Sequence, residues 1–379
     1  MKTKMLDFRL ATGQNVYALY QDVKAVKGIE SVINRFMLKV LKITNISKSD
    51  INLSKCEVSF KDIDGIVQTN YWNEKWLQAE IGHMKLIYIN PMVEELGYKK
   101  SWLSGDITDS LNLKPGQSVA IGVQHFDILS NQKISSAEVK CYYNKNEMVT
   151  YSFTITEYSL KRQYSLPLKG LVAGAGGVNG IISHRWANSP ENEFATDFHI
   201  LDKNLKPYAN DPFKASEYYC YGIDIYSPAE GTVVEAVDGI PDHPFAFNDK
   251  ELQKLTKRQK ENFPLKQIIY GNYLIIDHGN SEYSLLGHLQ KESIKVKKGE
   301  KIKREQVIAK CGNTGGSDAP HLHYQQMNNS YNAEAIGLPV KFENVESALF
   351  GEEVIKGSDN FNWYKELLKD TGILLLKTK

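Results

Sequence analysis

The 379-residue sequence contains no run of about 18 apolar residues, the length that a membrane-spanning helix needs. Its first twenty residues also lack the apolar core of a secretory signal, so we expect no transmembrane segment and see no signal peptide in this chain. Lys and Arg number 46 against 45 Asp and Glu, and the net charge of +1 speaks against nucleic acid as a partner. Hydrophobic residues make up 42% and charged residues 24%, a globular mix that excludes a long disordered chain or a collagen-like one.

Cysteine is also scarce. The four cysteines are scattered, with no CxxC pair among them: Cys56, Cys141, Cys220 and Cys311. A fold held together by disulfides is therefore not expected, and we predict buried thiols.

Tyrosine, in contrast, is plentiful, with 21 residues, and β-branched residues are frequent, which favours strands. Short alternating segments separated by turn residues fill positions 1–165 and predict an N-terminal β-sandwich-like module whose partner is unknown. The segment YWNEKWLQAEIG, residues 71–82, is the one helical candidate there. The fold class is expected to be all-β and mainly antiparallel.

The composition changes near residue 166, where a glycine-rich stretch opens a second series of strands. We predict a second domain over residues 166–345 and a C-terminal extension, 346–379, that packs on the body with a short helix and a final apolar strand. Residues 248–263 are rich in helix formers and basic side chains, and are interpreted as a surface helix or as a flap beside a groove. His243 and His278 stand in turn-like sequence and are expected to be exposed.

Most of the nine histidines lie in this second half, and three of them stand in two short motifs, LGHL and PHLH. Side chains alternate across a strand, so His321 and His323 point to one side and Leu322 points into the core. Two imidazoles on one sheet face are typical of a metal site, since a metal binds the neutral ring nitrogen. His184 and Asp197, thirteen residues apart, are further ligand candidates. The HExxH helix of thermolysin-like enzymes is absent.

Three longer segments resemble one family. They are YGIDIYSPAEGTVVEAVDG, GNYLIIDHGNSEYSLLGHL and SIKVKKGEKIKREQVIAKCGNTGGSDAPHLHY. In this order they resemble the lysostaphin-type (LytM-like) zinc metallopeptidases, which cleave peptide cross-links in bacterial peptidoglycan. The resemblance covers roughly residues 166–345. It implies a two-layer open β-sheet domain whose groove holds one catalytic zinc ion.

The resemblance also implies roles for five residues. His184, Asp197 and His323 match the zinc ligands, and His288 and His321 match the two non-ligand histidines that face the metal-activated water. The family's commonest pattern, HxGxD, offers a second mapping, in which Cys220 and Asp224 replace the first two ligands. We prefer the variant with a long His-to-Asp gap, since the segment from Gly222 to Pro228 then matches the strand that follows it.

The function implied is a hydrolase, a zinc metalloendopeptidase that acts on cross-links or stem peptides of the cell wall. The alternatives are a catalytically silent or latent scaffold that activates other wall hydrolases, and a zinc peptidase for a non-wall peptide. Because the wall lies outside the membrane, an extracytoplasmic location is expected, in the periplasm, in the cell envelope or secreted. A signal or anchor is then expected to have been trimmed from this chain.

Overall fold

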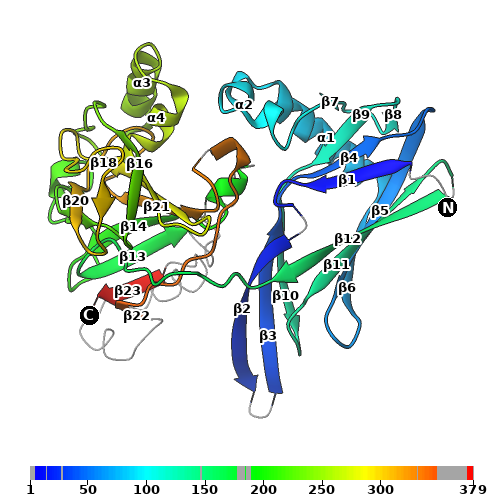
Figure 1. Cartoon of the computed structure of the whole chain (residues 1–379), viewed down its shortest axis with the longest axis horizontal. Helices are drawn as coiled ribbons and strands as arrows, with labels where there is room; N and C mark the ends of the chain where they lie inside the picture. Colours follow the sequence, from blue (N-terminus) through cyan, green and yellow to red (C-terminus); the bar gives the residue numbers. More distant parts are fainter. Residues whose placement is uncertain are drawn as a thin grey trace. The chain divides into compact units, whose positions relative to one another are not determined.

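The structure is a computed structural model that describes residues 5–13, 15–26, 29–145, 147–176, 184, 189–330, 332–347 and 374–378. The chain divides into two compact units (Figure 1). The first comprises Met1–Ser159 with Trp186–Pro190, and the second comprises Leu160–Arg185 with Glu191–Lys379. The predicted boundaries at 165/166 and 345/346 stay predictions.

The first unit consists of strands with a few short helices. Its elements are β1 (Leu6–Leu10), β2 (Asn15–Val26), β3 (Ile29–Leu38), β4 (Leu41–Asn45), β5 (Ile51–Lys61), β6 (Ile66–Trp72), α1 (Glu74–Ile89), α2 (Pro91–Glu95), a 3₁₀ turn (Tyr98–Lys100), β7 (Asp106–Ile107), β8 (Asn112–Leu113), β9 (Gln117–Ile121), β10 (Gln124–Ser130), β11 (Ser136–Tyr143) and β12 (Glu147–Thr156).

Two sheets of this unit share one apolar core. The smaller sheet has the order β1-β4-β9-β7, and the larger runs β10-β3-β2-β12-β11-β5-β6, with β8 added beside β5. Burial alternates residue by residue along β11, as the sequence pattern predicts. Phe8 and Ile43 from the smaller sheet and Phe36 and Phe60 from the larger belong to the same core cluster. Full burial of such a side chain contributes roughly 1.5–3 kcal/mol.

The predicted helix is confirmed as α1. The Asn73 side chain caps its N-terminus by accepting a hydrogen bond from the Trp76 backbone N–H at 2.9 Å. Leu77, Ile81 and Met84 form its buried stripe at the spacing that one helix face requires.

The prediction of buried thiols is wrong for one pair of cysteines. Cys56 on β5 and Cys141 on β11 lie opposite each other in the antiparallel ladder and form a disulfide. Their side chains point into the core, where the two strands bring the residues close enough for their sulfur atoms to bond. Cys220 and Cys311 are buried and free, as predicted.

The second unit contains the remaining elements. They are β13 (Leu171–Gly176), a 3₁₀ turn (Pro190–Asn192), β14 (Thr196–Leu201), a 3₁₀ turn (Ala215–Glu217), β15 (Asp224–Tyr226), β16 (Gly231–Val237), α3 (Asp249–Gln259), α4 (Leu265–Tyr270), β17 (Asn272–Asp277), β18 (Tyr283–Leu289), β19 (Lys301–Ile302), β20 (Val307–Lys310), β21 (Leu322–Met327), a 3₁₀ turn (Asn332–Glu334), β22 (Val345–Ser347) and β23 (Leu374–Thr378).

A nine-stranded antiparallel sheet of order β19-β16-β17-β18-β21-β14-β13-β23-β22 forms its body. The central strands β17, β18 and β21 are buried on both faces. On one face Leu274, Leu286 and Leu322 share a core with Ile225 and Ile308 of the small β15-β20 sheet. On the other face a second apolar cluster combines sheet residues with Tyr270 at the end of α4. Leu322 is therefore in the core, as predicted.

The mainly antiparallel all-β fold class is confirmed. The basic insertion forms helix α3, whose N-terminus is capped by Asn248. The predicted final strand is β23, which pairs with β13, whereas the short helix predicted before it lies outside the described residues. No helix in the described part of the chain is both long and apolar enough to cross a membrane.

Candidate metal centre

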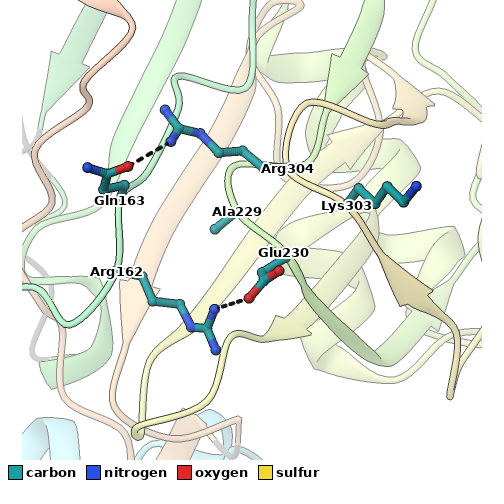
Figure 2. Close-up of a pocket in the computed structure, with 6 residues that line it drawn as sticks. All are labelled: Arg162, Gln163, Ala229, Glu230, Lys303 and Arg304. Atoms are coloured by element: carbon teal, nitrogen blue, oxygen red, sulfur yellow. Dashed lines mark hydrogen bonds and ion pairs between the residues drawn. The ribbon is translucent and has the colours of Figure 1, made fainter.

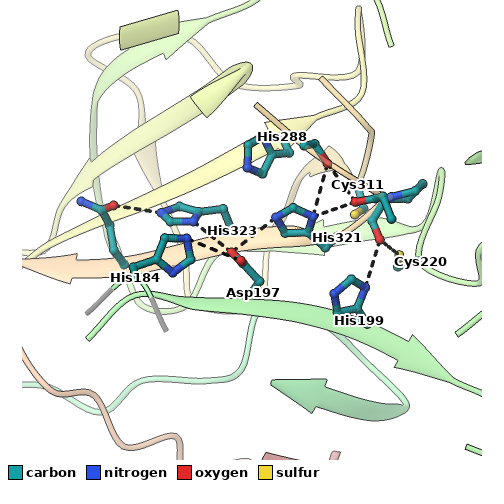
Figure 3. Close-up of polar contacts among 12 residues, drawn as sticks. His184, Asp197, His199, Cys220, His288, Cys311, His321 and His323 are labelled. Atoms are coloured by element: carbon teal, nitrogen blue, oxygen red, sulfur yellow. Dashed lines mark hydrogen bonds and ion pairs between the residues drawn. The ribbon is translucent and has the colours of Figure 1, made fainter. Parts of the chain in front are cut away.

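Two adjacent strands of the second unit carry the centre of the site. Asp197 on β14 and His323 on β21 are direct partners in the antiparallel ladder. Gly287 of β18 is the partner of His323 on its other side, where a Cβ would approach the Tyr270 carbonyl oxygen to 3.1 Å. Figure 3 shows the His323 ring beside the Asp197 carboxylate.

Three side chains bring one metal-binding atom each to a common point. The ligand atoms of His184, Asp197 and His323 all lie within 4.8 Å of one another. His184 Nε2 is 3.5 Å from Asp197 Oδ2, and His323 Nδ1 is 3.0 Å from Asp197 Oδ1. Ligand atoms about 2.0 Å from a tetrahedral zinc ion are separated by roughly 3.3 Å. The donor set, two imidazoles and a carboxylate, therefore fits zinc in both type and spacing.

His288 occupies a distorted position in β18. The pairing register between β17 and β18 shifts next to it, between Asn272 and Leu274, and its φ is +57°. Such a bulge turns a side chain away from its regular direction. The His288 ring is directed toward His321, with 4.5 Å between the ring centroids, and its Nδ1 lies 2.7 Å from the Thr314 carbonyl oxygen. Because a carbonyl only accepts, Nδ1 carries the hydrogen and Nε2 of the neutral ring is free to accept a proton.

His321 precedes β21 and is held in the same way. Its Nδ1 lies 2.7 Å from the Ala319 carbonyl oxygen, and its Nε2 lies 3.3 Å from Asp197 Oδ1 (Figure 3). The His321 side chain is 9% exposed and that of His323 is 3% exposed, against 28% for His184 and 24% for Asp197. The centre thus opens to solvent on the side of His184 and Asp197.

The pKa values of the metal-free site separate its ionisable groups. Burial lowers the pKa of His184 to about 4, and burial together with His321 and His323 holds the pKa of His288 well below its usual value. Burial would also lower the pKa of His321, but the Asp197 carboxylate outweighs this effect and raises the pKa of His321 to about 9. Burial would raise the pKa of Asp197, yet the neighbouring imidazoles outweigh it and keep the pKa well below the usual range. Asp197 is therefore ionised at neutral pH.

The alternative ligand pair is found elsewhere in the unit. Cys220 Sγ donates to the Pro320 carbonyl oxygen at 2.9 Å, and Asp224 pairs with the ammonium groups of Lys295 and Lys310. Neither belongs to the group of converging ligand atoms. His199 stands two residues after Asp197, but its Nδ1 faces the Pro320 carbonyl oxygen at 3.2 Å. The structure thus brings together the five residues of the long-gap mapping and leaves Cys220 and Asp224 out.

Sequence reasoning missed two side chains at this site. Tyr270 places its ring 5.4 Å from that of His323. Gln325 is the hydrogen-bond partner of the other nitrogen of the same imidazole, because its Oε1 lies 2.9 Å from His323 Nε2. Strand alternation was the signal that could have found Gln325, because it follows His323 by two positions. Tyr270 is placed by the end of helix α4, and no such signal in the sequence points to it.

The expectation that His243 and His278 are exposed is wrong. Each is 1% exposed. His243 Nε2 lies 2.7 Å from the Gly315 carbonyl oxygen, and His278 bridges the Glu230 carbonyl oxygen and the Ser284 hydroxyl, both at 2.8 Å. These hydrogen bonds offset the cost of burying two polar rings.

A separate hollow of about 270 Å³ lies in the same unit, lined by Arg162, Gln163, Ala229, Glu230, Lys303 and Arg304. Figure 2 shows that Arg162 is paired with Glu230 and that Arg304 reaches the Gln163 side chain. None of the five site residues lines this hollow, and its cationic side chains are not metal ligands.

Among the described residues, the converging ligand atoms of the second unit define a candidate metal centre. Residues 257–335 match the model of Peptidase family M23. This segment of the chain is therefore similar to the peptidase domain of family M23, the lysostaphin type of metallopeptidase.

Three curated proteins illustrate the similarity. Peptidoglycan DD-endopeptidase ShyA of Vibrio cholerae serotype O1 is 22% identical over 84% of this chain and 71% of its own length. Glycyl-glycine endopeptidase ALE-1 of Staphylococcus capitis is 41% identical over 21% of this chain and 20% of its own. Peptidoglycan DD-endopeptidase ShyB of Vibrio cholerae is 32% identical over 45% and 37%. The chain thus spans most of ShyA but well under half of the other two. Among solved structures, Helicobacter pylori Csd3 matches 92% of this chain and 82% of its own, at 14% identity and a TM-score of 0.26.

Proposed function

We propose that this protein is a zinc-dependent endopeptidase that cleaves cross-links or stem peptides of bacterial peptidoglycan. The observation that carries the proposal is the convergence of His184, Asp197 and His323 on one point, with His288 and His321 beside them. The printed names of ShyA and ShyB, peptidoglycan DD-endopeptidases, support the choice of substrate. The presence of all five side chains favours an enzyme over a silent scaffold.

Zinc held by His184, Asp197 and His323 would supply a Lewis acid that lowers the pKa of a water molecule toward about 7 and polarises a peptide carbonyl. His288 and His321 carry their Nδ1 hydrogens toward backbone carbonyls, so both use Nε2 for chemistry. In our proposal, one Nε2 accepts the proton of the attacking water. The other, when protonated, donates a hydrogen bond to the oxygen that becomes negative, and the proton taken from the water passes to the leaving amine.

We further propose an extracytoplasmic location. The substrate lies outside the membrane, and the Cys56–Cys141 disulfide suits an oxidising compartment.

The proposal is tested by digesting purified peptidoglycan with the zinc-loaded protein, with and without a chelator, and reading the products by mass spectrometry. We expect new amino termini that disappear with the chelator and return when zinc is added back. The mass of the products identifies the scissile bond. Absence of any product from protein that carries one zinc ion would contradict the proposed substrate.

Two variants separate binding from chemistry. His184→Ala is expected to lose both zinc and activity. His288→Ala is expected to keep its zinc and to lose roughly 10²–10⁴-fold in turnover, the usual contribution of a proton-transferring side chain. An exposed histidine on α1, His83, provides the matched control, since His83→Ala should change neither zinc content nor rate. Full zinc content in folded His184→Ala protein would refute the ligand assignment.

A further inference from the structure

A chain of three side chains continues from the metal-facing imidazole into the core of the second unit. His323, Gln325 and Met327 occupy alternate positions of β21 and therefore lie on one face of the sheet. Gln325 Oε1 lies 2.9 Å from His323 Nε2, and Gln325 Nε2 lies 2.8 Å from Met327 Sδ. Gln325 and Met327 are both fully buried.

We propose that Gln325 is a positioning residue, and that Met327 orients its amide so that His323 always presents Nδ1 to the metal. This inference rests on the proposed function, because it concerns the same zinc site. It names two residues that do not touch the metal and that the ligand motif does not include.

The direction of the amide decides which nitrogen of His323 is available. Because Oε1 of Gln325 faces the ring and can only accept, Nε2 of His323 must carry the hydrogen and donate it. The lone pair of Nδ1 is then left on the side of Asp197, available to the metal. The reversed amide would donate its N–H to Nε2, which would force the hydrogen onto Nδ1 and block the ligand atom. The partner of Gln325 therefore controls a property of the metal site.

Met327 favours the first arrangement over the second. A thioether sulfur is a weak acceptor and has no hydrogen to donate. It can accept from the amide N–H of Gln325, but it gives nothing to an amide oxygen. The sulfur lies in an apolar cluster with Tyr270 and Leu285, so an amide oxygen turned toward it would be buried without a hydrogen-bond donor, which is unfavourable. The amide is thus fixed at both ends.

The geometry also explains how the ring is held against rotation. The β14 partner of His323 is Asp197 and its β18 partner is Gly287, so its backbone is fixed in the middle of the sheet. Nε2 then has Gln325 as its fixed partner, and Nδ1 is left on the side of Asp197. Hydrogen-bond partners of metal-binding histidines typically contribute a factor of about 10–100 in metal affinity.

The experiment compares zinc affinity among four variants of the full-length protein, measured by competition with a chromophoric chelator. Gln325→Leu keeps the approximate volume and removes the acceptor, and we expect zinc to bind about 10–100-fold more weakly. Gln325→Glu restores an acceptor and should bind within a few-fold of the wild type. Met327→Leu removes the sulfur and should weaken zinc binding by a smaller factor, a few-fold.

Gln326→Leu is the matched control. Gln326 is equally buried and adjacent in sequence, but it points to the other face, where its Oε1 accepts from Ser284 and Tyr324. We expect this variant to lose stability and to keep its zinc affinity. A purely structural role for Gln325 would instead make the two leucine variants alike.

A spectroscopic readout that does not depend on activity completes the test. In zinc-loaded protein labelled with ¹⁵N histidine, the Nε2 hydrogen of His323 should exchange slowly with solvent in the wild type and faster in Gln325→Leu. Unchanged zinc affinity and unchanged exchange in folded Gln325→Leu overturn the inference while leaving the zinc site intact. Failure of the wild type to bind zinc overturns the proposed function and this inference together. If Gln325→Leu does not fold, unchanged affinity and exchange in Met327→Leu overturn it.

Discussion

Acid should weaken the second unit through His278, a histidine outside the metal site. Its ring lies between the Glu230 carbonyl oxygen and the Ser284 hydroxyl, with its edge against Tyr164. Burial lowers its pKa to about 4 in the folded protein, whereas in the unfolded chain the pKa returns to its ordinary value of 6.5. The folded protein therefore requires the neutral ring. The stabilisation is fully present above pH 6.5 and is lost as the pH falls from 6.5 toward 4.

The magnitude follows from that difference of about 2.5 pH units. At about 1.36 kcal/mol for each pH unit, the full loss is about 3 kcal/mol, and about 2 kcal/mol of it occurs between pH 7 and pH 5. Other ionisable groups face His278 as well, since Arg162 opposes its protonation and Asp277 and Glu282 favour it. These contributions are already part of the lowered pKa.

Hydrogen exchange of the β17 and β18 amides reports on the second unit by itself and is the assay of choice. His278→Asn keeps a donor for the Glu230 carbonyl oxygen and removes the titrating ring. In chelator-treated protein, we expect the wild type to lose about 2 kcal/mol more than this variant between pH 7 and pH 5. Comparison at each pH cancels the intrinsic exchange rate. His83→Asn, at an exposed position of α1, is the control. Equal losses in the wild type and in His278→Asn would refute the reasoning.

Two further predictions concern the backbone and the disulfide. Gly271 has a φ of +67°, and a Cβ there would overlap Thr314, the residue whose carbonyl holds His288. Gly271→Ala should therefore lower the free energy of unfolding by about 3 kcal/mol or more and reduce turnover. Gly299→Ala, at a φ of +88° with open space around it, should lower the free energy of unfolding by about 1–2 kcal/mol and leave turnover unchanged. Denaturant titration measures the first quantity and steady-state kinetics the second. Replacing Cys56 and Cys141 by alanine should cost the first unit roughly 2–5 kcal/mol and leave zinc binding unchanged. Equal zinc affinity with an undiminished unfolding free energy would show that the disulfide does not stabilise the first unit.

Local patterns in the sequence predicted those parts of the fold that depend on neighbouring residues. Alternation placed Leu322 in the core and His321 with His323 on one side. The α1 helix follows from its capping residue and its buried stripe. The order of short motifs, through the family they resemble, named the five residues that the structure brings together, although spacing alone left Cys220 and Asp224 in contention.

Features that depend on the register between distant strands were out of reach. The Cys56–Cys141 disulfide joins residues 85 positions apart, and only the pairing of β5 with β11 makes them neighbours. His278 stands in turn-like sequence, yet Tyr164 and Ser284 enclose it. One of its hydrogen-bond partners is a backbone carbonyl, which the amino-acid sequence does not reveal.

The HxH motif shows why residue type alone does not assign a role at this site. His321 and His323 are the same residue, two positions apart, and both direct a ring nitrogen at Asp197. His321 Nδ1 is bound by a backbone carbonyl, so Nε2 faces the carboxylate, whereas His323 Nε2 is bound by Gln325, so Nδ1 faces it. His323 Nδ1 lies 3.0 Å from Asp197 Oδ1, and His323 belongs to the group of converging ligand residues. His321 Nε2 lies 3.3 Å from the same oxygen, and the His321 ring lies beside that of His288, where the proposed mechanism needs a proton donor or acceptor. In the proposed mechanism, the partner of the other nitrogen therefore separates the metal ligand from the proton carrier, and changing that partner should change the role.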